Sequence, residues 1–143
     1  MGFTMETLNA YNSEDILRAS RGEIVPTDIR RVTVPALVDT GAYWCGLHRP
    51  EIETLGLSDY VEIPVGTGNG VARFKRYTPG PMLELQGRRT NMDILELPDH
   101  MPAIIGVGLL ESLVFIVDPI SQRVIPDPAR GGRQEHWMFG MGA

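Results

Sequence analysis

The chain of 143 residues contains a single cysteine, Cys45, so no disulfide bond can form within it. This scarcity is typical of a reducing compartment, and we expect a cytoplasmic location. No apolar run approaches the roughly 18 residues that a membrane span needs, so we expect no membrane partner. Residues 1–6 contain neither a basic nor an apolar stretch, and we therefore expect no secretory signal.

Positive charge is also scarce. Lys and Arg together number 13 against 18 Asp and Glu, which gives a formal net charge of −5 at pH 7. Proteins that bind nucleic acid present a strongly basic surface, so we expect no nucleic-acid partner.

Metal ligands and nucleophiles are few as well. Cys45 and His48 lie close in sequence, but a zinc site needs four ligands, and His100 and His136 are distant and unpatterned. We therefore expect no metal. A cysteine nucleophile would need His48 as a base held by a third group, and this alternative stays open. A small core residue beneath a loop is the favoured interpretation of Cys45.

Glycine and proline are abundant, with 16 and 11 copies, and they divide the chain into short pieces. Short apolar runs between such turn residues favour a mostly β fold. The length predicts one domain, which we place at 1–128, followed by a tail at 129–143. The tail is either disordered or locally packed, or it packs on a partner subunit through Trp137, Met138 and Phe139.

The apolar runs and turn residues predict the following elements. Strands are expected at 3–8, 29–38, 60–64, 71–77, 114–117 and 124–125, with a second hairpin formed by 82–85 and 92–97 around a turn at 86–88. Two short helices are expected, one starting at Pro50 and stopping at Gly56, the other within 109–113. The polar stretch 9–30 predicts a loop.

One short segment contains a candidate catalytic residue. Three apolar residues, 36–38, run directly into Asp39, Thr40 and Gly41. A buried strand would thus deliver a carboxylate to a tight turn, and the glycine lets the backbone fold back. Asp, Thr and Gly also favour turns that have no function, so this segment alone is compatible with a catalytic aspartate and with an ordinary turn. A second apolar segment ending in glycine, Ile104-Ile105-Gly106, favours the catalytic one.

These two segments resemble the retropepsin-like (retroviral-type) aspartic proteases of the small single-domain kind that also occurs in bacteria. The similar region spans about 33–128. The resemblance implies a small closed β-barrel with one or two short helices, active as a homodimer. It implies that Asp39 is the catalytic carboxylate, supported by Thr40 and Gly41. It also implies that Ile104, Ile105 and Gly106 pack behind the active-site loop.

The glycine-rich run 66–70 is similar to the tip of the flap that closes over substrate in that family. The resemblance then implies a substrate-binding set, which comprises Ala42, Tyr43, Thr67, Gly68, Asn69 and Gly70. Tyr43 and Trp44 stand where viral members carry acidic residues, and Val107 stands where they carry arginine. A hairpin turn without function is the alternative for this run. A phosphate-binding loop is disfavoured because a strand-like run, not a helix, follows it.

The function implied is that of an aspartic endopeptidase acting on a peptide or protein substrate, without metal, cofactor or covalent intermediate. Because the chain supplies one Asp-Thr-Gly, two subunits must each contribute an Asp39. A retropepsin-like dimer that binds peptides without turnover is the alternative, suggested by Tyr43, Trp44 and Val107. A monomer whose Asp39 awaits a different partner chain is the third possibility.

Overall fold

The computed structural model describes residues 3–136, and over this range the chain is mostly β. Nine strands form one large sheet: β1 (Met5–Tyr11), β2 (Arg31–Asp39), β3 (Cys45–Leu47), β4 (Tyr60–Thr67), β5 (Gly70–Tyr77), β6 (Met82–Leu85), β7 (Arg88–Asn91), β8 (Ile94–Glu96) and β9 (Ile104–Gly106). Their spatial order is β4-β5-β8-β3-β9-β2-β1-β6-β7. The remaining two strands, β10 (Phe115–Asp118) and β11 (Arg123–Pro126), form a separate hairpin.

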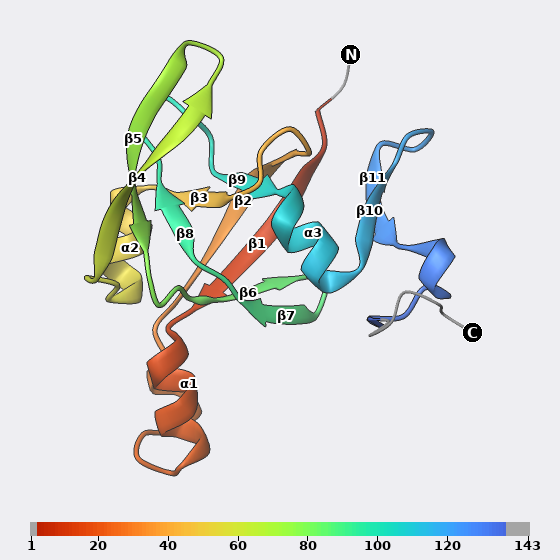
Figure 1. Ribbon diagram of the computed structural model, residues 1–143. Helices are drawn as coiled ribbons and strands as arrows, with labels where there is room; N and C mark the ends of the chain where they lie inside the picture. The colour runs from red at the N-terminus through yellow and green to blue at the C-terminus, as the bar shows by residue number, and fades with distance from the viewer. Residues whose placement is uncertain (1–2, 137–143) are drawn as a thin grey trace.

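Three α-helices and two 3₁₀ turns complete the fold: α1 (Ser13–Ser20), α2 (Arg49–Leu55), α3 (Val107–Leu113), η1 (Pro26–Asp28) and η2 (Pro128–Arg130). Helix α2 packs against β2, and α3 packs against β7, β9 and β10. The β4–β5 hairpin rises from one end of the sheet, whereas α1 projects from the opposite end of the molecule (Figure 1). Within residues 3–136, none of the helices combines the length and the apolar content needed to cross a membrane.

The core fills the space between the sheet and helices α2 and α3. Its fully buried large side chains come from strands and helices alike: Leu8, Leu47, Ile52, Leu55, Leu83, Leu85, Ile94, Ile105, Leu109 and Leu113. The alternating pattern of β1 and β6 delivers Leu8, Leu83 and Leu85 to one face of the sheet. Burial of these aliphatic side chains anchors the strand that leads to Asp39.

Both sequence-predicted helices are found. Arg49 and Pro50 open α2, and Gly56 ends it in a left-handed conformation with φ of 71°. A glycine adopts that conformation without the steric cost that a Cβ would bring. The helix within 109–113 starts slightly earlier, at Val107, directly after β9.

The prediction of a loop over 9–30 is wrong for most of its length, because β1 extends to Tyr11 and α1 and η1 also lie within this range. The Asn12 side chain caps α1 by accepting a hydrogen bond from the Asp15 backbone N–H at 2.8 Å. Asp15 is itself buried and is held by the Arg30 guanidinium, with an Nε–Oδ2 distance of 2.8 Å. The buried residue of this helix is the charged Asp15, paired with Arg30, so apolar periodicity in the sequence does not predict the helix.

The second hairpin is also different from the prediction. Strand β6 pairs with β7, which covers Arg88–Asn91, whereas 92–97 was expected as the partner. Strand β8 lies elsewhere in the sheet, parallel to β3 and antiparallel to β5. Its residues Ile94 and Leu95 are buried between these neighbours. The turn residues of the sequence do not indicate that β8 pairs with β3 and β5.

The closed barrel is not found in the part of the chain that the structure describes. The two edge strands, β4 and β7, do not pair with each other. Arg88 of β7 instead donates to the carbonyls of Leu113 and Val114, at 2.8 and 3.1 Å, and to that of Gly132 at 2.8 Å. The Arg88 side chain thus links β7 to the end of α3 and to the segment that follows it. The tail residues Trp137, Met138 and Phe139 lie outside the described residues.

Candidate active site

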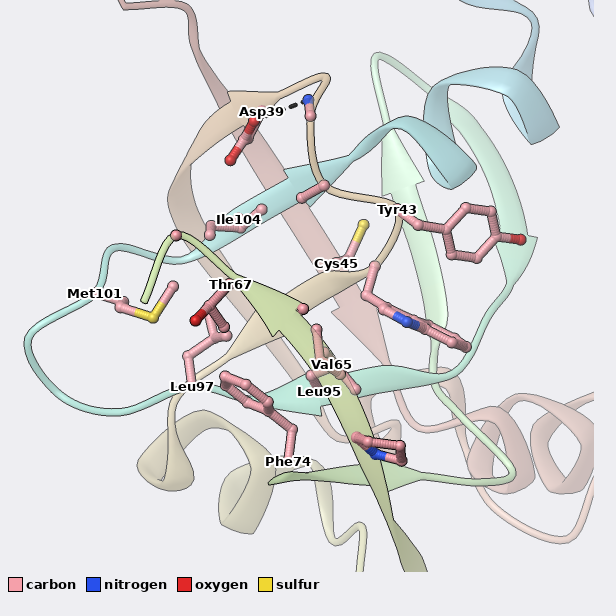
Figure 2. A pocket seen from close by; sticks show the side chains of 16 residues that line it. Asp39, Tyr43, Cys45, Val65, Thr67, Phe74, Leu95, Leu97, Met101 and Ile104 are labelled. Atoms are coloured by element: carbon pink, nitrogen blue, oxygen red, sulfur yellow. Dashed lines mark hydrogen bonds between the residues drawn. The ribbon is translucent and has the colours of Figure 1, made fainter. Parts of the chain in front are cut away.

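Asp39 is the last residue of β2 and stands opposite Gly106 in the parallel β2–β9 pair. Its Oδ1 accepts a hydrogen bond from the Gly41 backbone N–H at 2.9 Å, shown as a dashed line in Figure 2. The Ala42 N–H donates to the Asp39 carbonyl at 3.1 Å and closes the turn. The carboxylate is thus fixed at the end of a strand, half-buried, with Oδ2 not engaged in this turn.

Ile104, Ile105 and Gly106 lie directly behind this turn, as the resemblance implies. In the β2–β9 register Leu37 faces Ile104 and Val38 faces Ile105. At the start of α3, the Val107 N–H donates to the Ala42 carbonyl at 2.7 Å. Strand β9 and the start of α3 therefore support the loop that follows Asp39.

Position 106 requires glycine because the backbone of the loop after Asp39 lies too close for a side chain. A Cβ at this position would lie 2.4 Å from the Tyr43 carbonyl oxygen and 2.5 Å from that of Trp44. Real Cβ atoms do not approach oxygen so closely, so any side chain here would push the loop away. The glycine lets the active-site loop rest on β9.

Cys45 is fully buried beneath the loop, which confirms the interpretation as a core residue. Its Sγ accepts from the Gly106 N–H at 3.4 Å, and burial raises the pKa of the thiol to about 12. His48 makes its contacts elsewhere, with the Met101 carbonyl and Glu51. A thiol kept protonated in this way is a poor nucleophile, so the cysteine-nucleophile alternative finds no support in the geometry.

Strands β4 and β5 form a regular hairpin whose last pair is Thr67 with Gly70. At its tip the Thr67 hydroxyl donates to the Gly70 carbonyl at 2.8 Å and accepts from the Asn69 N–H at 3.2 Å. Gly70 has φ of 109°, which favours glycine. A strand follows the glycines, so the helix N-terminus that a phosphate loop needs is not present at this place.

A cavity of about 700 Å³ separates the hairpin tip from Asp39. Gly66, Thr67 and Gly68 line it on the hairpin side, and Asp39, Gly41 and Ala42 line it on the loop side. Asn69 and Gly70 complete the tip without lining the cavity. The structure thus brings together most of the residues that the sequence singled out.

The remaining walls of the cavity are apolar. They comprise Trp44, Cys45, Pro64, Val65, Phe74, Leu95, Leu97, Met101 and Ile104, together with Tyr43 at the margin. Leu95, Leu97 and Ile104 are buried and form a cluster on which Val65, Phe74 and Met101 pack. Among the described residues that line this cavity, Asp39 is the only carboxylate.

Sequence reasoning missed most of this apolar wall. The signal was present in the period-two spacing of Ile63 with Val65 and of Leu95 with Leu97, which places each pair on one face of its strand. Nothing local in the sequence shows that these two faces meet, because β4 and β8 become neighbours of the site only through the sheet order.

Tyr43 and Trp44 flank the cavity and do not fill it. Their rings meet edge to face with centroids 5.1 Å apart, and the Arg76 guanidinium lies over the Trp44 ring at 4.9 Å. Tyr43 is 53% exposed, and in Figure 2 its ring points away from Asp39 and Thr67. The space between the carboxylate and the hairpin therefore stays open.

Asp39 also borders a second hollow on the other side of the turn. This hollow is lined by Phe3, Thr4, Leu37, Val38, Asp39, Thr40, Val117, Asp118, Pro119 and Gln122. The Thr4 hydroxyl donates to the Gln122 carbonyl at 2.7 Å and ties the N-terminal segment to the turn between β10 and β11. Large apolar side chains are exposed around it, with Phe3 at 80% and Ile120 at 92%. We call this surface the Asp39 face.

No family model matches the chain, and no curated protein matches it. A search of the described residues for groups of three or more His, Cys, Asp or Glu placed to hold a metal ion finds none. The carboxylate, the hairpin above it and the exposed Asp39 face are thus the features that bear on function.

Proposed function

We propose that the chain is a retropepsin-like aspartic endopeptidase, active as a homodimer with one Asp39 from each subunit. The observation that carries the proposal is the position of Asp39. A strand end holds this carboxylate, through the Gly41 N–H, at the floor of an apolar cavity that a glycine-rich hairpin overhangs. A carboxylate that lines a cleft under a strand hairpin is suited to hydrolysis of an extended chain.

The chemistry needs two carboxylates. Two aspartates facing each other a few ångströms apart cannot both ionise cheaply, so the pair shares one proton. The ionised member takes a proton from a water, whose oxygen attacks the carbonyl carbon of the peptide bond, while the protonated member donates to the carbonyl oxygen. Transfer of a proton to the amide nitrogen then lets the C–N bond break. Thr40 would fix the two loops by hydrogen bonding across the dimer axis.

The Asp39 face supports a second copy as the partner. It contains Asp39 and Thr40, so a two-fold axis close to it would bring the two carboxylates together. It exposes Phe3 and Ile120, two large apolar side chains that a partner could bury. Within residues 3–136, β10 and β11 pair with no strand other than each other, so a second copy could add a strand to this hairpin.

We expect Ile120→Asp to weaken the dimer at least about tenfold in Kd, because a charge would replace a large apolar contact at the interface. Ile120 is 92% exposed in the single chain, so the fold should be unaffected. Sedimentation velocity across a concentration series measures the change. Val25→Asp is the matched control, since Val25 is also exposed, at 57%, but lies between α1 and η1. Equal dimer affinity in wild type and Ile120→Asp would contradict the proposed interface.

The cavity walls favour apolar substrate side chains next to the cleaved bond. Val65, Phe74 and Leu97 offer only hydrocarbon surface to the cavity that Asp39 also lines. We expect peptides with Leu, Met or Phe at this position to be cut with kcat/KM at least about tenfold higher than peptides with Ala there. Profiling with a defined peptide library measures the preference. A preference for charged side chains would contradict it.

The proposal as a whole is tested by incubating the purified dimer with a mixed peptide library across pH, with pepstatin as inhibitor control. Cleavage at defined bonds that depends on Asp39 supports the peptidase. A verified dimer that binds peptides and cuts none would instead favour the alternative of a retropepsin-like dimer that binds peptides without turnover. A chain that stays monomeric at high concentration would favour a different partner for Asp39.

A further inference from the structure

The loop between β8 and β9 carries two side chains into the cavity, Leu97 at its start and Met101 in its middle. Pro98, Asp99 and His100 are exposed, whereas Met101 is half-buried and lines the cavity. A turn in which the Met101 N–H donates to the Pro98 carbonyl at 3.0 Å sets its position. Figure 2 shows the Met101 side chain at the far side of the cavity from Tyr43, next to the hairpin tip that bears Thr67. Met101 therefore forms the end wall of the cleft.

His48 holds this loop from a different element. It precedes α2, and its Nε2 lies 2.6 Å from the Met101 carbonyl oxygen. Its Nδ1 lies 3.2 Å from Oε1 of Glu51, in the first turn of the same helix. The Leu97 N–H donates to the carbonyl of Leu47, the last residue of β3, at 2.8 Å. The chain at 47–48 therefore contacts the loop at its start, through Leu97, and in its middle, through Met101. The imidazole is 22% exposed and bridges helix and loop.

We propose that His48 is a positioning residue: it fixes Met101 as the end wall of the cleft beneath the hairpin tip, and it does so more firmly in acid than at neutral pH. The effect on peptide hydrolysis rests on the proposed function. The effect on the loop does not.

The two ring nitrogens explain the pH dependence. A neutral imidazole has one donor and one acceptor, so when Nε2 donates to the Met101 carbonyl, Nδ1 turns a lone pair toward the Glu51 carboxylate. Protonation supplies a second donor and satisfies both partners. The charged groups nearby act in the same direction, with Glu51 on α2 and Asp99 on the loop. The neighbouring cation, Arg49, is paired with Glu96 at 3.2 Å.

These contacts raise the pKa of His48 above its ordinary value of 6.5, the Met101 carbonyl being the largest cause, ahead of Glu51 and Asp99. Because the pKa is higher in the folded state, protonation stabilises the anchored loop. That stabilisation is complete below pH 6.5 and is lost as the pH rises through the folded-state pKa. A shared-proton aspartate pair also loses its proton as the pH rises, so the cleft wall and the chemistry would respond to pH in the same direction.

The loop is tested by NMR of methionine methyl groups across pH, with Met101→Leu assigning the Met101 signal. We expect the Met101 methyl shift to move with a midpoint above 6.5, and the His48 ring signals to titrate at the same midpoint in the wild type. His48→Gln keeps a donor but cannot titrate, so the response should vanish there. His100→Gln is the matched control, because His100 lies on the same loop, exposed, and removing it should leave the response intact.

The effect on function is tested by the pH dependence of KM for a peptide cleaved in an Asp39-dependent manner. His48→Gln should raise KM in acid by about fivefold, the equivalent of one hydrogen bond, with kcat little changed. A Met101 methyl that ignores pH, or that still titrates in His48→Gln, would overturn the proposal. A pH-dependent Met101 in a protein that cuts no peptide would leave the His48 anchor standing and remove the proposed peptidase.

Discussion

Replacing Asp39 by asparagine is expected to abolish peptide cleavage while leaving fold and dimer intact. The asparagine oxygen can still accept the 2.9 Å hydrogen bond from the Gly41 N–H, so the turn keeps its shape. An amide cannot take a proton from water, and two amides cannot share one. General acid–base catalysis is then lost from both sides of the dimer, and we expect kcat to fall at least about a thousandfold.

The measurement is cleavage of a peptide library by wild type and Asp39→Asn, at matched dimer concentration confirmed by sedimentation. Asp28→Asn serves as control, because Asp28 is exposed in η1 and lies outside the cavity. It should keep full activity. Unchanged cleavage by Asp39→Asn would falsify the assignment of Asp39 as the catalytic carboxylate, whatever the fold.

Gly106→Ala is expected to cause a large loss of stability. The new Cβ would lie 2.4 Å from the Tyr43 carbonyl oxygen and 2.5 Å from that of Trp44, and both contacts are with backbone atoms that no rotamer change can relieve. The loop after Asp39 must then move off β9, which strains the hydrogen bonds from Val107 and Gly108 to the carbonyls of Ala42 and Tyr43. We expect a cost of about 3 kcal/mol.

Thermal unfolding of Gly106→Ala measures this cost as a Tm lower by about 10 °C. Gly66→Ala is the matched control, because a Cβ at Gly66 meets no atom within 4 Å and the residue lies in strand β4. Its Tm should be unchanged or slightly higher. A Gly106→Ala protein as stable as wild type would mean that the loop does not rest on β9 as described.

Several parts of the fold could be predicted because their causes are local. Helix α2 is bounded by Pro50 at its start and Gly56 at its end, and both residues act through their own backbone preferences. The β4–β5 hairpin follows from two strand-like runs around glycines. The strand into Asp39 follows from an apolar run that ends in a turn.

Other parts depended on partners far away in the chain. Helix α1 buries Asp15, which a polar sequence does not suggest, because Arg30 supplies the neutralising charge. Strand β8 leaves the expected hairpin because β3 and β5 offer it two buried neighbours. The edge strand β7 is linked through Arg88 to the end of α3 and does not pair with β4, so the predicted barrel closure is absent from the described residues.

The mostly β class, the single carboxylate at a strand end, the glycine-rich hairpin and the apolar-apolar-glycine segment can all be predicted from adjacent residues. That these segments meet, that the cavity wall is built from Phe74, Leu97 and Met101, and that Tyr43 points away from Asp39 depends on the folded chain. The contact between His48 and the Met101 loop depends on it as well. The physical reason is that burial and pairing across the sheet depend on which distant strands become neighbours, which no local pattern encodes.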